Sequence, residues 1–365
     1  MPMLRQAQLR HAKYFQGILN LCGQLYLEGG DRLQIALRLF DQERDQIEHV
    51  LVWAQKQNQD DEAAARLCSE LPVLGLFCLQ LRWPTSQRIS YLWSALEAAR
   101  LLKDRDLEYA HLANLGLSYL DAGDNKRAIP LLEQALEIVQ GMDDSWSRAS
   151  IVGNLGIAYE GLDDFEKAIE YHERNLEIAR AIPDRRSESA ALGNLGNTFQ
   201  RMNDIQRAIE YHEQALRLDR EIGYLEGEGM ELGNLGACFL TLGETDKAIE
   251  LSEQALAICR KVGDQRTESN VLATLGQVYE KSGQFTRAVE LFQQALRLSQ
   301  KVGDRRSEAQ NFLLLGSTQY EMGDRARART NVESALAVFE QIESPQTEDV
   351  RNQLNKWRNV LAKPS

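Results

Sequence analysis

A pattern of apolar and small residues returns every 40 residues through most of the chain. Its clearest element is a Leu-Gly pair, which occurs six times at constant spacing without insertion or deletion. The six pairs begin at Leu115, Leu155, Leu195, Leu235, Leu275 and Leu315. An alanine series with the same spacing runs from Ala128 to Ala328. A fixed period of about 20–50 residues indicates a stack of similar units rather than one globular core.

Each unit contains two helix patterns separated by a polar break. Leu195, Phe199 and Met202 are spaced as one face of a helix. The break follows at Asn203, and other units carry at this position a glycine suited to a left-handed turn. These glycines are Gly243, Gly283 and Gly323. Asn203 with Gln206 three residues later predicts the N-terminal cap of a second helix. We therefore expect each unit to be a pair of antiparallel helices.

The glycine of each pair lies inside the first predicted helix. A glycine there destabilises a helix by about 1 kcal/mol relative to alanine. Its return in six units indicates that a close contact offsets this cost. Since packed helix axes lie only about 8–10 Å apart, we expect these glycines and the Ala128 series at the closest helix contacts.

The order Asn-Leu-Gly, an aromatic residue three positions later, Ala-Ile-Glu and Gln-Ala-Leu resembles the tetratricopeptide repeat. The 40-residue length is similar to the repeats of Pins-type spindle-orientation adaptors and kinesin light chains. The resemblance covers roughly residues 64–342, with departures at Gln319 and Asn175. It implies an all-α, right-handed superhelical solenoid of antiparallel helix pairs.

We predict three regions along the chain. They are residues 1–60, an N-terminal helical pair; residues 61–342, seven tetratricopeptide repeats; and residues 343–365, a C-terminal capping helix. The first repeat is degenerate, because the Leu-Gly frame is lost at Gly75. Ser344 and Pro345 are expected to end the last repeat. The capping helix would cover the final apolar face, as solenoids require. Its predicted apolar residues are Val350, Leu354, Trp357 and Val360.

The N-terminal 100 residues resemble a second kind of protein. The phrases RHAKYFQGIL and LFDQERDQIEHVLVWAQ are similar to the segment that joins the ATPase of bacterial STAND-type signalling proteins to their C-terminal repeats. That resemblance implies an ATPase upstream, which these 365 residues do not contain. Two readings stay open: a stand-alone sensor arm, or a chain cut from a longer STAND-type protein.

Composition narrows the partners and the compartment. The formal net charge is −12 and no basic stripe is evident, which disfavours nucleic acid and anionic membrane surfaces. Five cysteines without C-x-x-C spacing fit free thiols in a reducing cytoplasm. No apolar run suggests a signal peptide or a membrane span. We expect a cytoplasmic protein.

Motifs for catalysis are not found in the sequence. No glycine is followed by lysine, which removes a phosphate-binding loop of the G-x-x-x-x-G-K-[ST] type. Gly227 and Gly229 imitate a dinucleotide loop, but we place them between repeat helices with no strand before them. His172 and His212 begin a zinc motif whose second histidine is missing, and their equivalent places indicate packing. We predict no enzyme, no catalytic residue, no cofactor and no metal.

One polar series stands out: an asparagine precedes the Leu-Gly pair in four consecutive units. The four are Asn114, Asn154, Asn194 and Asn234. The resemblance places them on the first helices facing the concave groove, where such an asparagine bonds the main chain of a bound peptide. A carboxamide has a donor and an acceptor, so it can match any peptide unit. The alternative is that the asparagines only cap or bridge helices of the stack.

Further groove candidates lie three and seven residues beyond this position. They are Asn197, Arg201, Gln277 and Lys281, with apolar Leu117 and Ile157 toward the N-terminal end. Arg186, Arg266 and Arg306 could meet an acidic partner at the groove mouth, or pair with the glutamates two positions on.

The favoured function is a non-enzymatic scaffold that holds a protein or peptide segment in the groove. The alternatives are the sensor arm of a STAND-type ATPase and, from its helical N-terminal region before seven helix pairs, a peptide-signal receptor. The sequence identifies neither the partner nor its orientation, and self-association stays possible.

Overall fold

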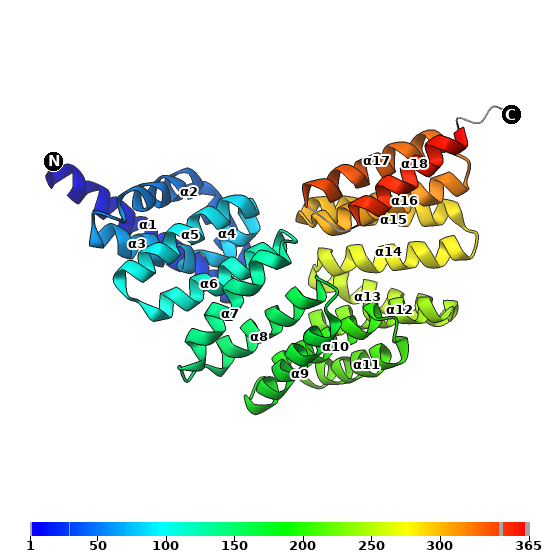
Figure 1. Ribbon diagram of the computed structural model, residues 1–365, viewed down its shortest axis with the longest axis horizontal. Helices are drawn as coiled ribbons and strands as arrows, with labels where there is room; N and C mark the ends of the chain where they lie inside the picture. The colour runs from blue at the N-terminus through cyan, green and yellow to red at the C-terminus, as the bar shows by residue number, and fades with distance from the viewer. Residues whose placement is uncertain (1, 29, 343–345, 362–365) are drawn as a thin grey trace. The chain divides into compact units, whose positions relative to one another are not determined.

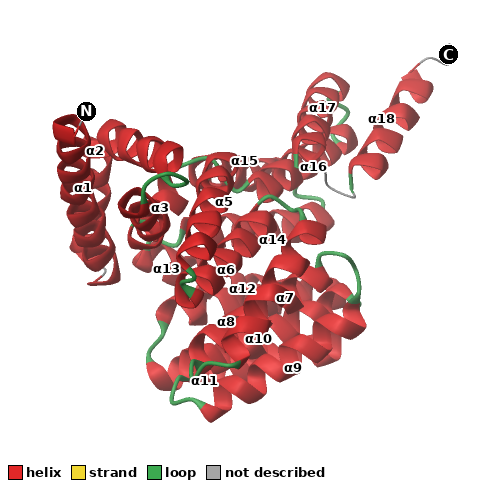
Figure 2. Cartoon of the chain, turned by 60° about the vertical axis from the view of Figure 1, so that its left-hand side comes forward, coloured by secondary structure: helices red, strands yellow, loops and turns green. Residues whose placement is uncertain are grey.

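The computed structural model describes residues 2–28, 30–342 and 346–361. These residues form eighteen α-helices and no strand, as the uniformly helical chain of Figure 2 shows. The all-α expectation is confirmed. The chain divides into two compact units, Met1–Leu162 and Asp163–Ser365, which are described separately.

The N-terminal unit contains eight helices, coloured blue to green in Figure 1. They are α1 (Pro2–Glu28), α2 (Gly30–Gln57), α3 (Glu62–Leu74), α4 (Leu76–Arg82), α5 (Thr85–Leu102), α6 (Arg105–Asp121), α7 (Asn125–Gln140) and α8 (Ser145–Glu160). Side chains of α1 to α5 share one apolar core, in which Phe40, Ile47 and Leu71 are fully buried. The degenerate first repeat is interrupted at Gly75, where α3 ends and α4 begins.

The C-terminal unit contains ten helices. They are α9 (Phe165–Ala181), α10 (Arg185–Arg201), α11 (Ile205–Ile222), α12 (Leu225–Leu242), α13 (Thr245–Val262), α14 (Gln265–Lys281), α15 (Phe285–Val302), α16 (Arg305–Glu321), α17 (Arg325–Gln341) and α18 (Thr347–Leu361). Each even-numbered helix from α10 to α16 pairs with the helix that follows it. The last helix packs on α17 through buried Val350 and Leu354.

Some of the predictions concern residues or side chains outside the described part of the chain. Ser344 and Pro345 lie outside the described residues, as do the side chains of Trp357 and Val360. The predicted region boundaries at residues 60 and 342 stay predictions.

First helices and second helices play different parts in the stack. In the C-terminal unit α10 contacts α12, α12 contacts α14, and α14 contacts α16. In the described residues, by contrast, the second helices α11, α13, α15 and α17 do not approach one another within 8 Å between Cα atoms. Because first helices are closer together, this stack curves around them, and their exposed faces form its inner surface.

The Leu-Gly glycines lie where the two helices of a pair meet most closely. A Cβ atom added to Gly116, Gly196, Gly236, Gly276 or Gly316 would come within 2.4–2.6 Å of a side chain sixteen residues later. Those side chains are Leu132, His212, Ser252, Phe292 and Val332. Only glycine fits without a shift of the neighbour, so the expected close contact is confirmed.

The turn inside each pair follows the predicted conformation but not the predicted cap. Asn203 has φ of 61° and Gly243 has φ of 80°, both in the left-handed region. The N-cap of α11 is Asp204, whose Oδ1 accepts a 3.2 Å hydrogen bond from the backbone N–H of Arg207. The capping pattern read at Asn203 was therefore wrong by one residue, because Asn203 provides the turn and leaves the cap to its neighbour.

Ion pairs with a constant separation of eight residues join consecutive repeats. The last turn of a second helix supplies an arginine and the next first helix supplies a glutamate. The pairs are Arg100–Glu108 (2.9 Å), Arg180–Glu188 (3.0 Å), Arg220–Glu228 (2.8 Å) and Arg260–Glu268 (2.8 Å). The arginines are about half exposed, so each pair contributes only about 0–1 kcal/mol.

The same substitution at two glycines of the N-terminal unit should have opposite effects. A Cβ at Gly116 would lie 2.6 Å from Leu132, whereas a Cβ at exposed Gly17 of α1 meets nothing within 4 Å. We expect Gly116→Ala to destabilise the protein by about 1–3 kcal/mol through overpacking. Gly17→Ala should stabilise it by roughly 1 kcal/mol through helix propensity. Urea unfolding followed by circular dichroism measures both. Two shifts of the same sign would contradict this account of the Leu-Gly glycines.

Candidate peptide-binding site

The four asparagines of the repeating series occupy equivalent places on first helices. Asn194 and Asn234 lie on α10 and α12 of the C-terminal unit, and Asn114 and Asn154 on α6 and α8 of the N-terminal unit. All four are half-buried. Their carboxamides make no hydrogen bond to any residue that the structure describes. The alternative in which they cap or bridge helices therefore finds no contact to support it.

The neighbouring candidates differ in how far they are already engaged. Asn197 and Gln277 are half-buried and, within the described chain, their side chains also lack a hydrogen-bond partner. Arg201 forms a 2.6 Å ion pair with Asp163 and lies 5.4 Å from the ring of Phe165. This groove candidate is therefore already engaged by residues of its own chain.

Lys281 and the apolar candidates complete this set. Lys281 Nζ donates a 3.2 Å hydrogen bond to the carbonyl of Leu240, at the end of the preceding first helix. Ile157 on α8 is 41% exposed, whereas Leu117 on α6 is half-buried. The N-terminal unit thus offers an apolar side chain next to Asn154 on the same helix.

The three arginines at the starts of first helices do not pair with the glutamates two positions later. Glu188 and Glu268 are instead bound by the arginines eight residues before them. Arg186 lies over the ring of Tyr224, with 4.7 Å between its guanidinium carbon and the ring centroid. Arg266 lies 3.4 Å from Asp304 of the next repeat. The expected pairing with Glu188 and Glu268 is wrong, because arginines at the end of the preceding second helix already bind these two glutamates.

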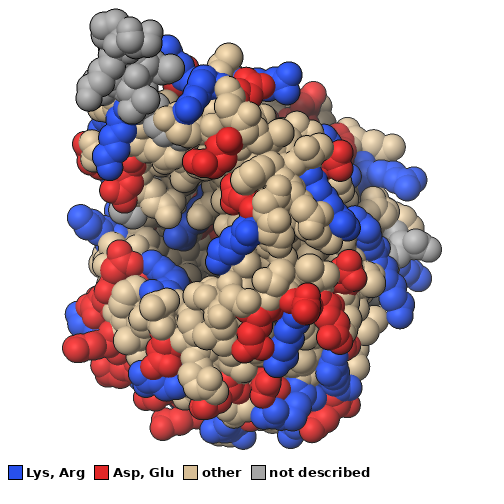
Figure 3. All heavy atoms as spheres, turned by 90° about the vertical axis from the view of Figure 1, so that its right-hand side faces the viewer, with Lys and Arg blue, Asp and Glu red and all other residues tan. Residues whose placement is uncertain are grey.

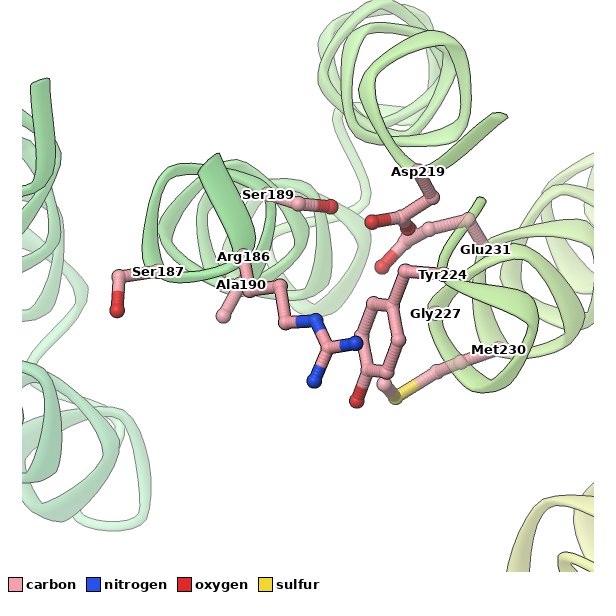
Figure 4. Close-up of a pocket in the computed structure, with 9 residues that line it drawn as sticks. All are labelled: Arg186, Ser187, Ser189, Ala190, Asp219, Tyr224, Gly227, Met230 and Glu231. Atoms are coloured by element: carbon pink, nitrogen blue, oxygen red, sulfur yellow. The ribbon is translucent and has the colours of Figure 1, made fainter. Parts of the chain in front are cut away.

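A cavity of about 260 Å³ lies between α10, the end of α11 and the start of α12. Figure 4 shows Asp219, Ser189 and Glu231 turned toward one another at its inner end, and Arg186 against Tyr224. Exposed Ala190 and Met230 also line it. Each precedes Asn194 or Asn234 by four residues, so cavity and asparagines share one face of the first helices.

Two buried carboxylates give this cavity its chemistry. Glu231 is held by His212, with 2.6 Å between its Oε2 and His212 Nδ1. Asp219 is only 1% exposed, and neither of its oxygens has a hydrogen-bond partner among the described residues. The Ser189 hydroxyl beside it donates to the Ala215 carbonyl at 3.4 Å.

Burial is the largest cause of a raised pKa at Asp219, which reaches about 6. The nearby Ser189 hydroxyl opposes this rise, and the negative charges of Glu231 and Glu228 add to it. A buried carboxylate without a partner is costly in its ionised form.

This cavity was missed at the level of sequence, although a signal existed. The positions 40 residues either side of Asp219 hold Ala179 and Cys259, and those either side of Glu231 hold Ala191 and Val271. A charged residue where sister repeats carry buried apolar ones marks a local exception. Gly227 and Gly229, dismissed as a false dinucleotide loop, lie inside α12 rather than between helices.

His172 and His212, read as packing residues, are both fully buried. His212 lies against Gly196, as the packing interpretation requires. It also has the additional role of holding Glu231.

Family models identify the repeats. A tetratricopeptide repeat model matches residues 147–221, 230–301 and 267–341, and a second model of this repeat matches residues 111–145. The matches extend over more than half of the chain, so the chain belongs to the tetratricopeptide repeat family. It is accordingly a repeat scaffold of the protein-binding kind, and this fold is typically non-catalytic.

Solved structures with the same fold extend over nearly the whole chain. A Rap protein complexed with competence and sporulation factor is 13% identical, with 93% of this chain and 98% of that chain covered and a TM-score of 0.62. The Rap conjugation gene regulator of plasmid pLS20, complexed with the Phr* peptide, is 13% identical, with 90% and 96% covered and a TM-score of 0.63.

A STAND protein with a tetratricopeptide repeat sensor from Pyrococcus horikoshii is 18% identical, with a TM-score of 0.54. The match covers 96% of this chain and 54% of that one. The expected likeness to STAND-type proteins is thus found at the level of the fold. A search of curated proteins finds no match to the sequence.

None of the helices in the described residues combines the length and the apolar character needed to span a membrane. No group of three or more His, Cys, Asp or Glu side chains among those residues could hold a metal ion. On the face in Figure 3, basic and acidic side chains are interspersed.

The raised pKa of Asp219 predicts a pH-dependent effect of Asp219→Asn. The wild-type carboxyl is neutral in the folded state below about pH 6 but ionises near pH 4 when the chain unfolds. Its stabilising contribution is therefore present at low pH and is lost as pH rises through about 6. The Asp219→Asn variant should be more stable than wild type at pH 7.5, by about 2–3 kcal/mol relative to the difference at pH 4.

Thermal unfolding of both proteins by circular dichroism at the two pH values measures this difference. Glu213→Gln, an exposed acid on the same helix, serves as the control and should show no such trend. A wild-type protein that is more stable than the Asp219→Asn variant at pH 7.5 would show that Asp219 has a partner in the free protein.

Proposed function

We propose that the repeat array is a non-enzymatic scaffold that binds an extended segment of another protein, or a peptide, along the exposed face of its first helices. The observation that carries the proposal is the series of half-buried carboxamides without partners, within the described chain, at one position of successive first helices. Each can donate to and accept from the main chain of a ligand. Hydrogen bonds of this kind contribute about 0.5–1.5 kcal/mol each.

The comparison with Rap proteins supports a peptide as the ligand. Two of the similar structures are Rap proteins, one complexed with competence and sporulation factor and one with the Phr* peptide. We therefore infer that a peptide lies across Asn194 and Asn234, with Asn197 and Gln277 as further contacts on the same face.

Sensing within a larger regulator is a second candidate, favoured by the STAND protein with a repeat sensor. In that case the same face would bind the signal, and the N-terminal helices would transmit binding to an ATPase. Both candidates use the same site, so the experiment below tests what they share.

The charge distribution and the cysteines support two further properties of the scaffold, its class of partner and its compartment. Basic and acidic side chains interspersed over the face in Figure 3 support a protein partner rather than nucleic acid. Five free, buried cysteines support a reducing compartment, and we place the protein in the cytoplasm.

Removing two carboxamides from first helices should weaken peptide binding. Peptides selected from a random display library on the wild-type chain are resynthesised, and their affinity is measured by fluorescence anisotropy. We expect Asn194→Ala/Asn234→Ala to bind them at least tenfold more weakly, because about two to four main-chain hydrogen bonds are lost. Circular dichroism should show unchanged helicity.

The matched control removes two carboxamides from second helices, Gln206→Ala on α11 and Gln254→Ala on α13, both exposed. Its affinity should equal that of the wild type. Equal losses in both variants, or none in either, would refute a peptide site on the first helices.

A further inference from the structure

We propose that the cavity between α10, α11 and α12 is a specificity pocket that accepts the basic side chain of an arginine from the segment bound in the groove. This inference rests on the proposed function for the source of the side chain. The cavity itself stands on the geometry of Asp219, Glu231, Ser189 and Tyr224.

The Asp219 carboxylate is buried without a partner that neutralises its charge. Asp219 is 1% exposed and lines the cavity, and neither of its oxygens accepts a hydrogen bond of ordinary geometry within the described chain. The Ser189 hydroxyl lies near enough to lower the pKa of Asp219, but it donates its hydrogen bond to the Ala215 carbonyl. Buried polar groups in folded proteins are nearly always bonded, and an exception indicates a missing partner. A carboxylate is an acceptor only, so the missing partner is a donor, and a positive one would also remove the cost of a buried charge.

Glycines accommodate both carboxylates of the cavity. A Cβ at Gly227 would come 2.5 Å from Asp219 Oδ2, and a Cβ at Gly193 would come 2.5 Å from Glu231 Oε1. At the position of Gly227, the neighbouring repeats carry Ser187 and Thr267. Gly227 therefore makes room for the Asp219 carboxylate beside the cavity, where the sister repeats carry a side chain, at a cost of about 1 kcal/mol in helix stability.

The cavity opens on the face of the first helices that carries the asparagines. Met230, 42% exposed, and exposed Ala190 line the cavity one helical turn before Asn234 and Asn194. A peptide whose main chain is bonded by these two asparagines can direct one side chain between α10 and α12. At about 260 Å³ the cavity is smaller than most drug-binding pockets, which measure about 300–1,000 Å³, and suits a single side chain.

The charges around the cavity favour a cation of planar shape. Asp219 and Glu231 face it from α11 and α12, against one imidazole, that of His212. Arg186 at the mouth is turned to the ring of Tyr224, 4.7 Å away, and leaves Asp219 unpaired. Guanidinium groups bind carboxylates through two parallel hydrogen bonds, which an ammonium does less well. Met230, Ala190 and Tyr224 would contact the methylenes.

The same chemistry, an alkyl chain that ends in a cationic nitrogen group, also occurs in free polyamines. Three probes separate the sources. They are Nα-acetyl-arginine N-methylamide, its uncharged citrulline analogue, and agmatine, which has the guanidinium but no peptide units. Their dissociation constants are measured by isothermal titration calorimetry on the full chain, with NMR line positions as a check for weak binding.

We expect the arginine probe to bind wild type at least tenfold more tightly than the citrulline probe. Asp219→Asn should remove this preference while the protein stays folded, and Glu213→Gln on the outer side of α11 should retain it. No preference in the wild type, or an undiminished preference in the Asp219→Asn variant, would overturn the pocket. Agmatine binding as tightly as the arginine probe would assign the site to a free polyamine and overturn the peptide source.

Failure of the proposed function would look different. Asn194→Ala/Asn234→Ala is expected to weaken selected peptides and to leave the ratio between arginine and citrulline probes unchanged. If that variant binds selected peptides normally while the ratio persists, the groove proposal fails and a cation pocket remains. If peptide binding is weakened but no ratio exists in the wild type, the pocket fails and the groove remains.

Discussion

Close packing between the two helices of a repeat is the constraint on which the other features depend. A Cβ on the glycine of the Leu-Gly pair would lie 2.4–2.6 Å from the facing side chain in Gly116, Gly196, Gly236, Gly276 and Gly316. The facing residue varies from Leu132 to Ser252 and Phe292, so the stack tolerates a change of partner but not of the small residue. This contact sets the spacing within a pair. Each pair of the C-terminal unit then packs on the next mainly through its second helix and the first helix that follows, and successive first helices also touch. The exposed faces of the first helices carry the candidate site.

The sequence predicted the fold closely because the features that determine it repeat. Six copies of one pattern average out local exceptions, so helix pairs, their turns and their close contacts could all be read from the 40-residue spacing. Detail at single residues was less accessible. The cap at Asp204 was placed on Asn203, because both residue types favour caps and turns alike. The alternative that paired Arg186 with Glu188 was wrong, because the sequence does not reveal that Arg180 of the preceding helix binds this glutamate.

The candidate site likewise has one part that could be predicted from the sequence and one part that could not. The asparagine series was visible because it repeats, and the structure places each member on a first helix with a free carboxamide in the described chain. The cavity at Asp219 and Glu231 occurs once in the array and was therefore lost in the averaging. Residues that depart from a repeat deserve separate inspection, since a buried charge kept where sister units carry alanine, cysteine or valine has a cost that packing alone does not explain.

The single occurrence of Asp219 has a consequence for how a ligand is aligned. A row of equivalent carboxamides presents the same bonds after a shift of one repeat, so it leaves the alignment of a peptide degenerate. A single charged pocket at Asp219 would remove that degeneracy, because only one alignment of the peptide places a basic side chain in it. The carboxamides would then contribute affinity in every alignment, and the pocket would determine which residue of the peptide lies at which repeat.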